Sequence, residues 1–245
     1  MLSQPRTVLI TGATSGVGLA LARRLHAMGH RLVLLARSSE RLAQVRQSLP
    51  GSDSHACDLA DLRQLEATWA RIAADHPELS VLVNNAAIQS TPRFVDPDFD
   101  PAEIEREAAV NFIAPARLSH LALGLFRAHG RASAIVNVSS GLAFHPKSNA
   151  AVYCATKAAL HSLSRGLRYQ LEGTPVAVVE AILPLVDTPM TAGRGSGKIT
   201  ADSAAAQIVD GIARGRPEVY VGKARWLPVL SRISPAIPAA ILRRG

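Results

Sequence analysis

The sequence predicts an α/β protein built on a single Rossmann-like, doubly wound parallel sheet of about seven strands flanked by helices. Short apolar runs rich in β-branched residues alternate with longer segments rich in alanine and leucine, which is the pattern of repeated strand–helix units. A glycine-rich turn follows the first apolar run, and no linker-like stretch divides the 245 residues. We therefore expect one dinucleotide-binding domain spanning residues 1–245, with right-handed crossovers.

The first half of the chain is expected to alternate strand and helix. The predicted strands are 7–11, 31–36, 54–57 and 80–83, and the predicted helices run from the glycine-rich turn to Met28, over 40–49 and over 62–74. Each predicted strand is short and mostly apolar, as strands covered on both faces of a parallel sheet are. A loop with three prolines, 89–101, separates this half from the next.

The second half continues the alternation with longer helices. We predict helices over 102–129, 150–171 and 201–214, and strands over 133–138, 176–183 and 218–221. Between them lies a loop at about 185–200, in which Gly193–Gly197 is expected to be mobile. The tail, 226–245, is apolar and basic and contains three prolines, which would interrupt a long amphipathic helix. Covering a pocket or a subunit contact is therefore favoured over lying on a membrane.

Composition narrows the classes of partner. The net charge of +8 comes from scattered arginines, and aromatic residues make up only 4%, so the chain offers little for nucleic-acid binding. Two cysteines, Cys57 and Cys154, form neither a disulfide framework nor a metal cluster, and no histidine, cysteine or carboxylate set has metal-ligand spacing. With no signal-like start and no uninterrupted apolar stretch of about 18 residues, we expect a reduced, cytoplasmic protein, with membrane association unlikely and no metal.

A glycine-rich turn joins the first predicted strand to the first helix. Thr11–Gly18 reads Thr-Gly-Ala-Thr-Ser-Gly-Val-Gly. Glycines let the backbone approach a phosphate, and the free N–H groups and dipole of the following helix attract it. The spacing differs from the common Gly-x-Gly-x-x-Gly fingerprint, but the strand before and the helix after the turn favour a dinucleotide site.

The ends of the second and third strands bear on the choice of dinucleotide. Where an acidic residue would bind the 2′-hydroxyl of NAD, the chain has Ala36 followed by Arg37, which could pair with the 2′-phosphate of NADP or be a solvated strand-end arginine. Asp58, after the third strand, could accept a hydrogen bond from adenine or cap the helix that follows.

Tyr153 and Lys157 stand four residues apart in the predicted helix 150–171, so both point from the same helix face. A nearby ammonium favours the phenolate and would lower the pKa of Tyr153 from its ordinary value of about 10, which would suit a proton donor or acceptor. The alternative is an ordinary helix with a surface lysine and a half-buried tyrosine.

Taken in order, these motifs resemble those of the short-chain dehydrogenases/reductases over nearly the whole chain. Thr11–Gly18 is similar to the family's Thr-Gly-x-x-x-Gly-x-Gly turn, and Tyr153–Lys157 to its Tyr-x-x-x-Lys. Asn84–Ala87 resembles its Asn-Asn-Ala-Gly, with alanine as the last residue. After the sixth strand, Leu183-Pro184 replaces the usual Pro-Gly, and Pro184–Thr188 is similar to a bacterial subgroup resembling the oxidoreductase of the D-alanyl-teichoic-acid operon.

The resemblance implies a catalytic set of Asn111, Ser140, Tyr153 and Lys157. Ser140 is preferred to Ser139 because it precedes Tyr153 by thirteen residues, the family's usual interval. Tyr153 would transfer the proton, Lys157 would lower its pKa and bind the nicotinamide ribose, Ser140 would bind the substrate oxygen with Tyr153, and Asn111 would position a water. The implied cofactor-binding residues are Gly12, Thr14, Ser15, Gly16, Val17, Gly18, Arg37, Asp58, Leu59, Asn85, Ala86, Ala87, Tyr153, Lys157 and Thr188.

These expectations amount to an oxidoreductase that uses NADP(H), with NAD possible, to reduce a carbonyl or oxidise an alcohol. The substrate is expected to be small to medium and fairly apolar, and the candidate lining residues are Ile88, Gln89, Leu142, Phe144, Leu185 and the loop 190–199. The alternative is a non-catalytic NADP-binding sensor on the same fold, against which the intact catalytic set argues. Family resemblance also implies a homodimer or homotetramer that packs helices 102–129 and 150–171.

Overall fold

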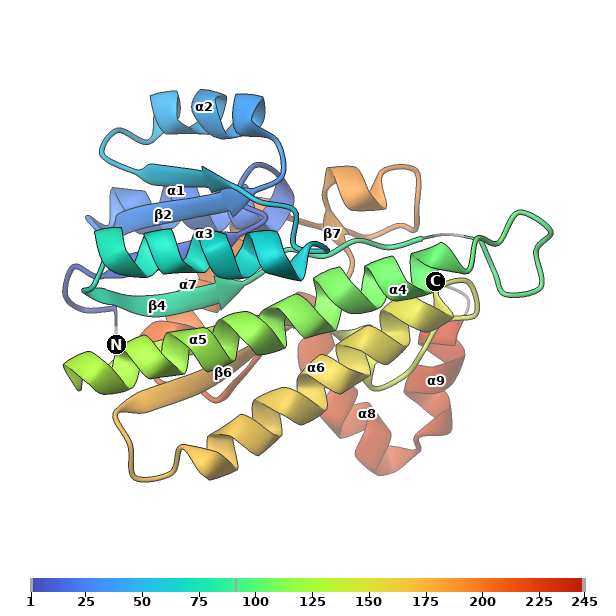
Figure 1. Ribbon diagram of the computed structural model, residues 1–245. Coiled ribbons are helices and arrows are strands. Elements are labelled where there is room, and N and C mark those ends of the chain that lie inside the picture. The colour runs from blue at the N-terminus through green and yellow to red at the C-terminus, as the bar shows by residue number, and fades with distance from the viewer. Residues whose placement is uncertain (1, 91, 244–245) are drawn as a thin grey trace.

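The computed structural model describes residues 2–90 and 92–243 and contains the expected seven-stranded sheet (Figure 1). All its strands are parallel, in the order β3-β2-β1-β4-β5-β6-β9, which confirms the predicted fold class. The strands are β1 Thr7–Thr11, β2 Arg31–Ala36, β3 Asp53–Ala56, β4 Leu79–Asn84, β5 Ser133–Ser140, β6 Val176–Leu183 and β9 Glu218–Tyr220. β5 reaches Ser140, two residues past its predicted end, so the two candidate serines are the last two residues of the strand.

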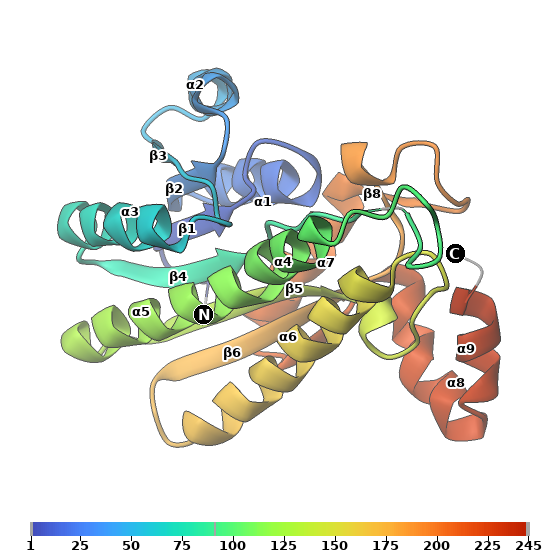
Figure 2. The ribbon, with the colours of Figure 1, turned by 45° about the vertical axis from the view of Figure 1, so that its right-hand side comes forward.

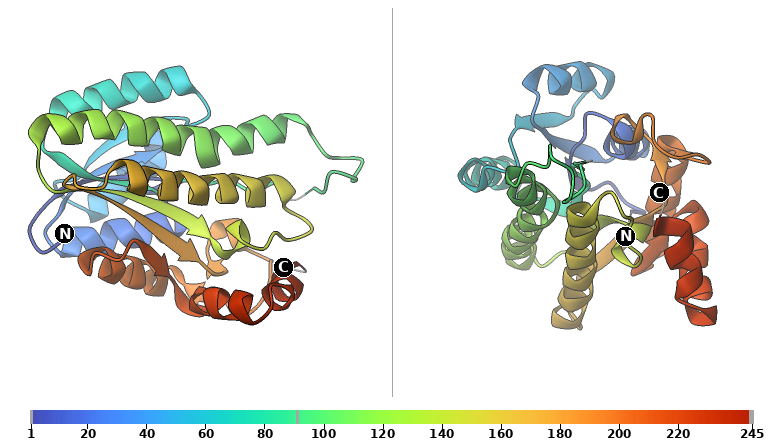
Figure 3. Two further views of the ribbon diagram at one scale, coloured as in Figure 1. Left: turned by 90° about the horizontal axis from the view of Figure 1, so that it is seen from below. Right: turned by 90° about the vertical axis from the view of Figure 1, so that its right-hand side faces the viewer.

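Helices cover both faces of the sheet (Figure 3). The helices are α1 Gly16–Ala27, α2 Ser39–Ser48, α3 Leu62–Asp75, α4 Ala102–Ala108, α5 Ala114–His129, α6 Ala151–Gln170, α7 Ala201–Ala213, α8 Leu227–Ile233 and α9 Ala236–Arg243. Alternate strand residues point to opposite faces. Thus Ile10 and Leu34 pack with α1, α2 and α7, whereas Leu9 and Val33 pack with α3 and α5. The central strands of the sheet therefore bury apolar side chains on both faces, as the sequence indicated.

A chain of buried amides joins the central strands. Asn84 Nδ2 donates to Asn137 Oδ1 at 2.8 Å, and Asn137 Nδ2 donates to Ser164 Oγ at 2.9 Å, which links β4, β5 and α6. All three side chains are buried. Buried polar groups need such partners, so these contacts fix the relative positions of three elements whose ends carry candidate site residues.

The predicted helix 102–129 is continuous but changes its winding in the middle. Between α4 and α5, Ala109–Ile113 forms a π-helical turn that carries Asn111. Such turns are rare and are often found at functional sites. This 28-residue stretch is the one segment of the described chain that is long and apolar enough to cross a membrane by length and composition alone. Leu118, Ala122 and Phe126 on it are buried against the sheet, as in the core helix of a globular protein.

The segment after β6 contains a short pair of strands that the sequence did not predict. Val186–Asp187 (β7) pairs in parallel with Ile199–Thr200 (β8), and this two-stranded sheet closes the base of the loop that we expected at 185–200. The tail then forms α8 and α9, separated at Ser234 and Pro235, beside the carboxyl ends of the strands (Figure 2). As predicted, the prolines prevent one long helix.

Packing between α7 and β9 provides a test of the fold. A Cβ atom added to Gly211 would lie 2.3 Å from Val219 Cγ2, inside the core, so Gly211→Ala should lower the free energy of unfolding by about 1–3 kcal/mol. Gly124→Ala is the matched control, because Gly124 is a helical glycine with no heavy atom within 4 Å of the added Cβ. It should raise stability by about 0.5–1 kcal/mol. Equal effects of both changes in denaturant unfolding would contradict the packing described here.

Candidate dinucleotide and substrate site

One large cavity, of about 1320 Å³, lies at the carboxyl ends of the strands. This edge of an open parallel sheet is where ligands of α/β proteins bind. Of the residues predicted to bind cofactor or substrate, the cavity is lined by Gly12, Thr14, Ser15, Gly16, Val17, Arg37, Asp58, Leu59, Asn85, Ala86, Ala87, Ser140, Tyr153, Lys157 and Thr188. Two predicted residues, Gly18 and Asn111, lie behind its wall.

The glycine-rich turn is packed directly against the end of β4. A Cβ atom on Gly18 would lie 2.2 Å from Gly12 O, and one on Gly12 would lie 2.9 Å from Ala86 Cα. Gly12 also has a φ of +67°, a backbone conformation that residues other than glycine rarely adopt. Asn85 Nδ2 donates to Thr11 O at 2.9 Å and so holds β4 against the turn. Gly18 therefore serves this close approach rather than lining the cavity.

The start of α1 is open to an anion. Ser15 is the N-cap of α1, its side chain makes no capping hydrogen bond, and the first turn contains no acidic residue. The N–H groups and the positive end of the helix dipole are thus available to a negative group in the cavity. Thr188 lies on the other side of this turn, with its Cγ2 atom 3.0 Å from the position of an added Cβ on Gly16.

A small basic group lies where β2 passes into α2. Arg37 lines the cavity as predicted, and Ser38 and Arg41 line it too. Ser38 is the N-cap of α2, and its Oγ accepts a hydrogen bond from Arg41 N at 3.2 Å. The sequence reasoning did not include Ser38 or Arg41. The sequence did contain a signal for Arg41, because this residue lies in the first turn of the helix that directly follows Arg37 and Ser38.

Asp58 and the cap of α3 are distinct. Asp58 Oδ1 accepts from Ala60 N at 3.0 Å, within the loop that follows β3. The cap is Asp61, whose Oδ1 accepts from Arg63 N and Gln64 N, each at 3.0 Å. The alternative in which Asp58 caps the helix is therefore wrong, and its side chain stays at the cavity wall.

Tyr153 and Lys157 both project from α6 into the cavity wall, as their spacing predicted. Lys157 Nζ lies 5.5 Å from the centre of the Tyr153 ring and donates to Val138 O at 2.9 Å. Only 2% of Lys157 is exposed, and burial lowers its pKa to about 8 although the charge of Glu180 opposes the change. The ammonium is thus close to the phenol but tied to the backbone of β5.

The pKa of Tyr153 moves in the opposite direction from the prediction. Burial raises the Tyr153 pKa above its ordinary value, the Cys154 thiol adds to the rise, and a hydrogen bond with Ser140 opposes it. The expected lowering by Lys157 is therefore wrong for this structure, because the loss of solvent is the largest effect on the Tyr153 pKa. The phenol is consequently held in its protonated form at neutral pH.

Of the two serines at the end of β5, Ser140 is the one whose side chain interacts with Tyr153 in a way that counters the rise in the tyrosine pKa. Its Oγ also accepts from Leu142 N at 3.2 Å, which orients the hydroxyl at the start of the next turn. Ser139 Oγ is buried and has no hydrogen-bond partner. The preference for Ser140 agrees with this geometry.

Asn111 lies behind the cavity and binds segments that form the cavity wall. Its Oδ1 accepts from Ile88 N at 2.8 Å, and its Nδ2 donates to Ile88 O at 2.9 Å and to Thr156 Oγ1 at 3.2 Å. The amide thus fixes the segment after β4 to α6. The side chain is fully engaged by protein groups and does not reach the cavity.

The outer part of the cavity is lined largely by apolar residues, including several from the tail. The predicted residues Ile88, Gln89, Leu142 and Leu185 line it, as do Met190, Thr191 and Gly193–Gly197 of the loop. The tail contributes Trp226, Leu227, Leu230, Pro238, Ile241 and Leu242, which is the covering role expected for it. The prediction for Phe144 is wrong, because its ring packs on His161, with centroids 4.6 Å apart, and does not line the cavity.

Two hydrogen bonds hold the tail in this position. His145 Nε2 and Ser231 Oγ are 3.0 Å apart, and Ser148 N donates to Arg243 O at 3.0 Å. His145 therefore anchors α8. Lys147, Arg194 and Lys223 also line this region, and Arg194 Nη1 donates to Gln89 Oε1 at 2.9 Å across the cavity.

Known proteins resemble this chain over most of its length. The model of the short chain dehydrogenase family matches residues 6–198. The oxidoreductase DltE of Bacillus subtilis is 41% identical over 230 residues, covering 87% of this chain and 86% of its own. A fatty acyl-CoA reductase of Acinetobacter baylyi is 30% identical, covering 98% and 84% respectively.

Solved structures agree with the fold. A short-chain dehydrogenase from Sphingobium yanoikuyae in complex with NADPH is 29% identical, covers 95% of each chain and superimposes with a TM-score of 0.81. The matched segment contains the glycine-rich turn, Ser140, Tyr153 and Lys157. This chain is a member of the short-chain dehydrogenase/reductase family of oxidoreductases, within the group that resembles DltE.

Proposed function

We propose that the protein is an NADP(H)-dependent reductase or dehydrogenase that interconverts a carbonyl compound and its alcohol, with Tyr153 as the proton donor and acceptor. The observation that carries this proposal is that Ser140 and Tyr153, as a pair, line the same cavity as the glycine-rich turn and the open start of α1. A hydride donor seated on the turn and a carbonyl held by the pair would share one space. A sensor would need only the first of these features.

The residues of the turn fit a dinucleotide. The close packing of Gly12 and Gly18 leaves the backbone of the turn bare at the cavity, where Cβ atoms would otherwise intrude. The start of α1 would hold the pyrophosphate, Asp58 and Leu59 the adenine, and Lys157 and Thr188 the nicotinamide end. When bound, the nicotinamide would supply or accept the hydride.

Proton transfer would fall to Tyr153. Its raised pKa keeps the phenol protonated at neutral pH, which is the state needed to protonate the oxygen of a carbonyl as it is reduced. Ser140 would bind the same oxygen through its hydroxyl. Lys157, held by Val138 O, would place a positive charge beside the phenol as negative charge develops on it. In the reverse direction Tyr153 would first have to lose its proton, and only the resulting phenolate could accept one from an alcohol.

Preference for NADP over NAD is supported by Arg37 and Arg41. Both arginines line the cavity together with Ser38, and none of the described acidic residues lines that stretch at the end of β2. A 2′-phosphate is a dianion that arginine binds through charge-assisted hydrogen bonds. NAD, which lacks this phosphate, would bind less tightly.

A fairly apolar substrate fits the outer cavity. Leu142, Leu185, Leu227 and Leu230 form much of the wall beyond Tyr153. Apolar walls with a few polar groups are typical of sites for small organic ligands. The carbonyl would meet Ser140 and Tyr153, and the apolar body would lie under the tail.

Replacement of Tyr153 by phenylalanine tests the proton donor. Tyr153→Phe removes only the hydroxyl, so kcat with NADPH and a reducible carbonyl should fall about 10²–10⁴-fold while NADPH still binds. Tyr169→Phe is the matched control, because Tyr169 lies on the same helix but is 64% exposed and far in sequence from the pair. Full activity of Tyr153→Phe would disprove the assigned role, and binding without turnover by the native protein on any carbonyl would favour a sensor.

Replacement of Arg37 tests the choice of dinucleotide. A hydrogen bond to a charged group contributes about 1.5–3 kcal/mol, so Arg37→Ala should lower kcat/KM for NADPH about 10–100-fold and leave that for NADH nearly unchanged. Arg41→Ala should act in the same direction. Arg23→Ala, on the exposed side of α1 away from the cavity, is the control of equal charge. An equal loss with both dinucleotides would show that Arg37 does not recognise the 2′-phosphate.

A further inference from the structure

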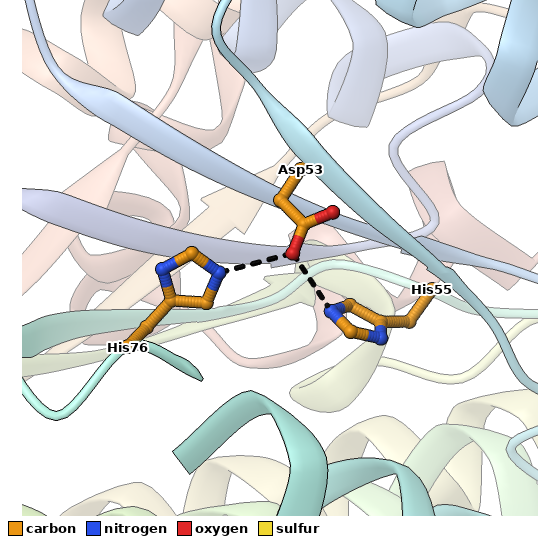
Figure 4. A group of neighbouring side chains, drawn as sticks. All are labelled: Asp53, His55 and His76. Carbon is orange, nitrogen blue, oxygen red and sulfur yellow. Dashed lines mark hydrogen bonds and ion pairs between the residues drawn. The ribbon is translucent and has the colours of Figure 1, made fainter. Parts of the chain in front are cut away.

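A second group of polar side chains lies on the edge strand β3, outside the cavity. Asp53 and His55 are two residues apart on β3, so their side chains point to the same face of the sheet. His76 directly follows α3 and precedes β4. Figure 4 shows the three side chains converging, with both imidazole rings directed at one carboxylate. None of them lines the dinucleotide and substrate cavity.

The distances within this group suit a metal ion. His55 Nε2 lies 3.2 Å and His76 Nε2 lies 3.1 Å from the same oxygen, Asp53 Oδ2, and the three atoms all lie within 4.8 Å of one another. Zinc binds imidazole nitrogen and carboxylate oxygen at about 2.0–2.2 Å, so neighbouring tetrahedral ligands are separated by about 3.3 Å. Each histidine nitrogen already stands at nearly that separation from the Asp53 oxygen.

An unpartnered ring nitrogen of His76 points to the same conclusion. If its Nε2–H donates to Asp53, its Nδ1 is a bare acceptor, and this buried atom has no hydrogen-bond partner. Its nearest charged neighbour is another acceptor, Glu78 Oε1, at 3.8 Å. Moving the proton to Nδ1 would point an N–H at Glu78 and free the Nε2 lone pair. Histidines that bind metals are commonly oriented by a carboxylate in this way.

Charge and exposure also favour a cation here. Asp53 and Glu78 supply two negative charges, and Arg31 Nη1, at 3.5 Å from Glu78 Oε1, is the cation that pairs with this group among the described residues. The His55 and His76 side chains are 14% and 10% exposed, whereas that of Asp53 is 39% exposed. Nitrogen ligands would thus be held by the protein, and a water could reach the remaining position.

A comparable group elsewhere in the fold is less suitable. His161, Glu180 and Glu218 also lie close together, but Arg168 Nη2 pairs with Glu218 Oε1 at 3.1 Å. Tyr220 donates to the other oxygen of Glu218 at 2.9 Å. A cation entering there would have to displace the guanidinium.

We propose that Asp53, His55 and His76 bind one Zn²⁺ ion, with Glu78 orienting His76. The sequence suggested no metal, because His55 and His76 are far apart along the chain and only the β3–α3–β4 crossover brings them together. Bound zinc would join the edge strand to the end of α3. Since β3 leads directly into Asp58 and Leu59, the ion would also brace the wall of the adenine end of the cavity.

Zinc binding to untagged, chelator-treated protein tests the proposal. Titration with ZnCl₂, followed by calorimetry and by competition with a chromophoric chelator, should give one ion per chain. A ligand at 100 times its Kd should raise the Tm of a protein of this size by about 5–10 °C, and EDTA should reverse the shift. A stoichiometry well below one, or no rise in Tm at saturating zinc, would overturn the proposal.

Variants locate the ion. His55→Gln and Asp53→Asn should weaken zinc binding at least tenfold, and Glu78→Gln, which removes no ligand, should weaken it about 10–100-fold. His120→Gln, an exposed histidine on α5, should bind zinc as the native protein does. Retention of full affinity by His55→Gln, or its loss in His161→Gln instead, would place the ion elsewhere and refute the assignment. Glu78→Gln leaves all three ligands in place, so it tests the site even if replacing a ligand prevents the protein from folding.

Discussion

The close contact between the glycine-rich turn and the end of β4 is the constraint on which the candidate active site depends. Gly12 and Gly18 allow two backbone segments to meet where any side chain would separate them, and Asn85 ties the meeting point with its amide. The floor of the cavity is therefore backbone, which presents N–H groups and little bulk. The Asn84–Asn137–Ser164 chain extends this rigidity sideways to the strand that carries Ser140 and the helix that carries Tyr153.

Burial sets the chemistry of the residues above that floor. Lys157 and Tyr153 are both shifted toward their neutral forms, since each loses water that would solvate its charge. The phenol is therefore protonated at neutral pH, and the amine beside it, with a pKa of about 8, still carries its positive charge for most of the time. The protein thus holds a proton in place, and hydrogen bonds to Ser140 and Val138 O aim it.

The fold could be predicted because its signals are local. Apolar runs, helix periodicity and the motif around Tyr153 each lie within a short window, and the strand order follows from the family and from right-handed crossovers. Features that depend on contacts between distant segments could not be predicted from the sequence. Phe144 packs on His161, the β7–β8 pair joins the two ends of the loop that follows β6, and the pKa of Tyr153 depends on burial that no spacing reveals. The Asp53 group also exists only after folding.

The helices α8 and α9 lie outside the segment that matches the family model, so their sequence can vary separately from that of the dinucleotide-binding part. The family match ends at residue 198, whereas the helices that roof the cavity begin at Leu227. They contact the rest of the chain largely through apolar side chains and the anchors at His145 and Ser148. Mutations in this roof can therefore reshape the entrance without disturbing the backbone floor, so that evolution can exchange one substrate for another while dinucleotide recognition is inherited intact.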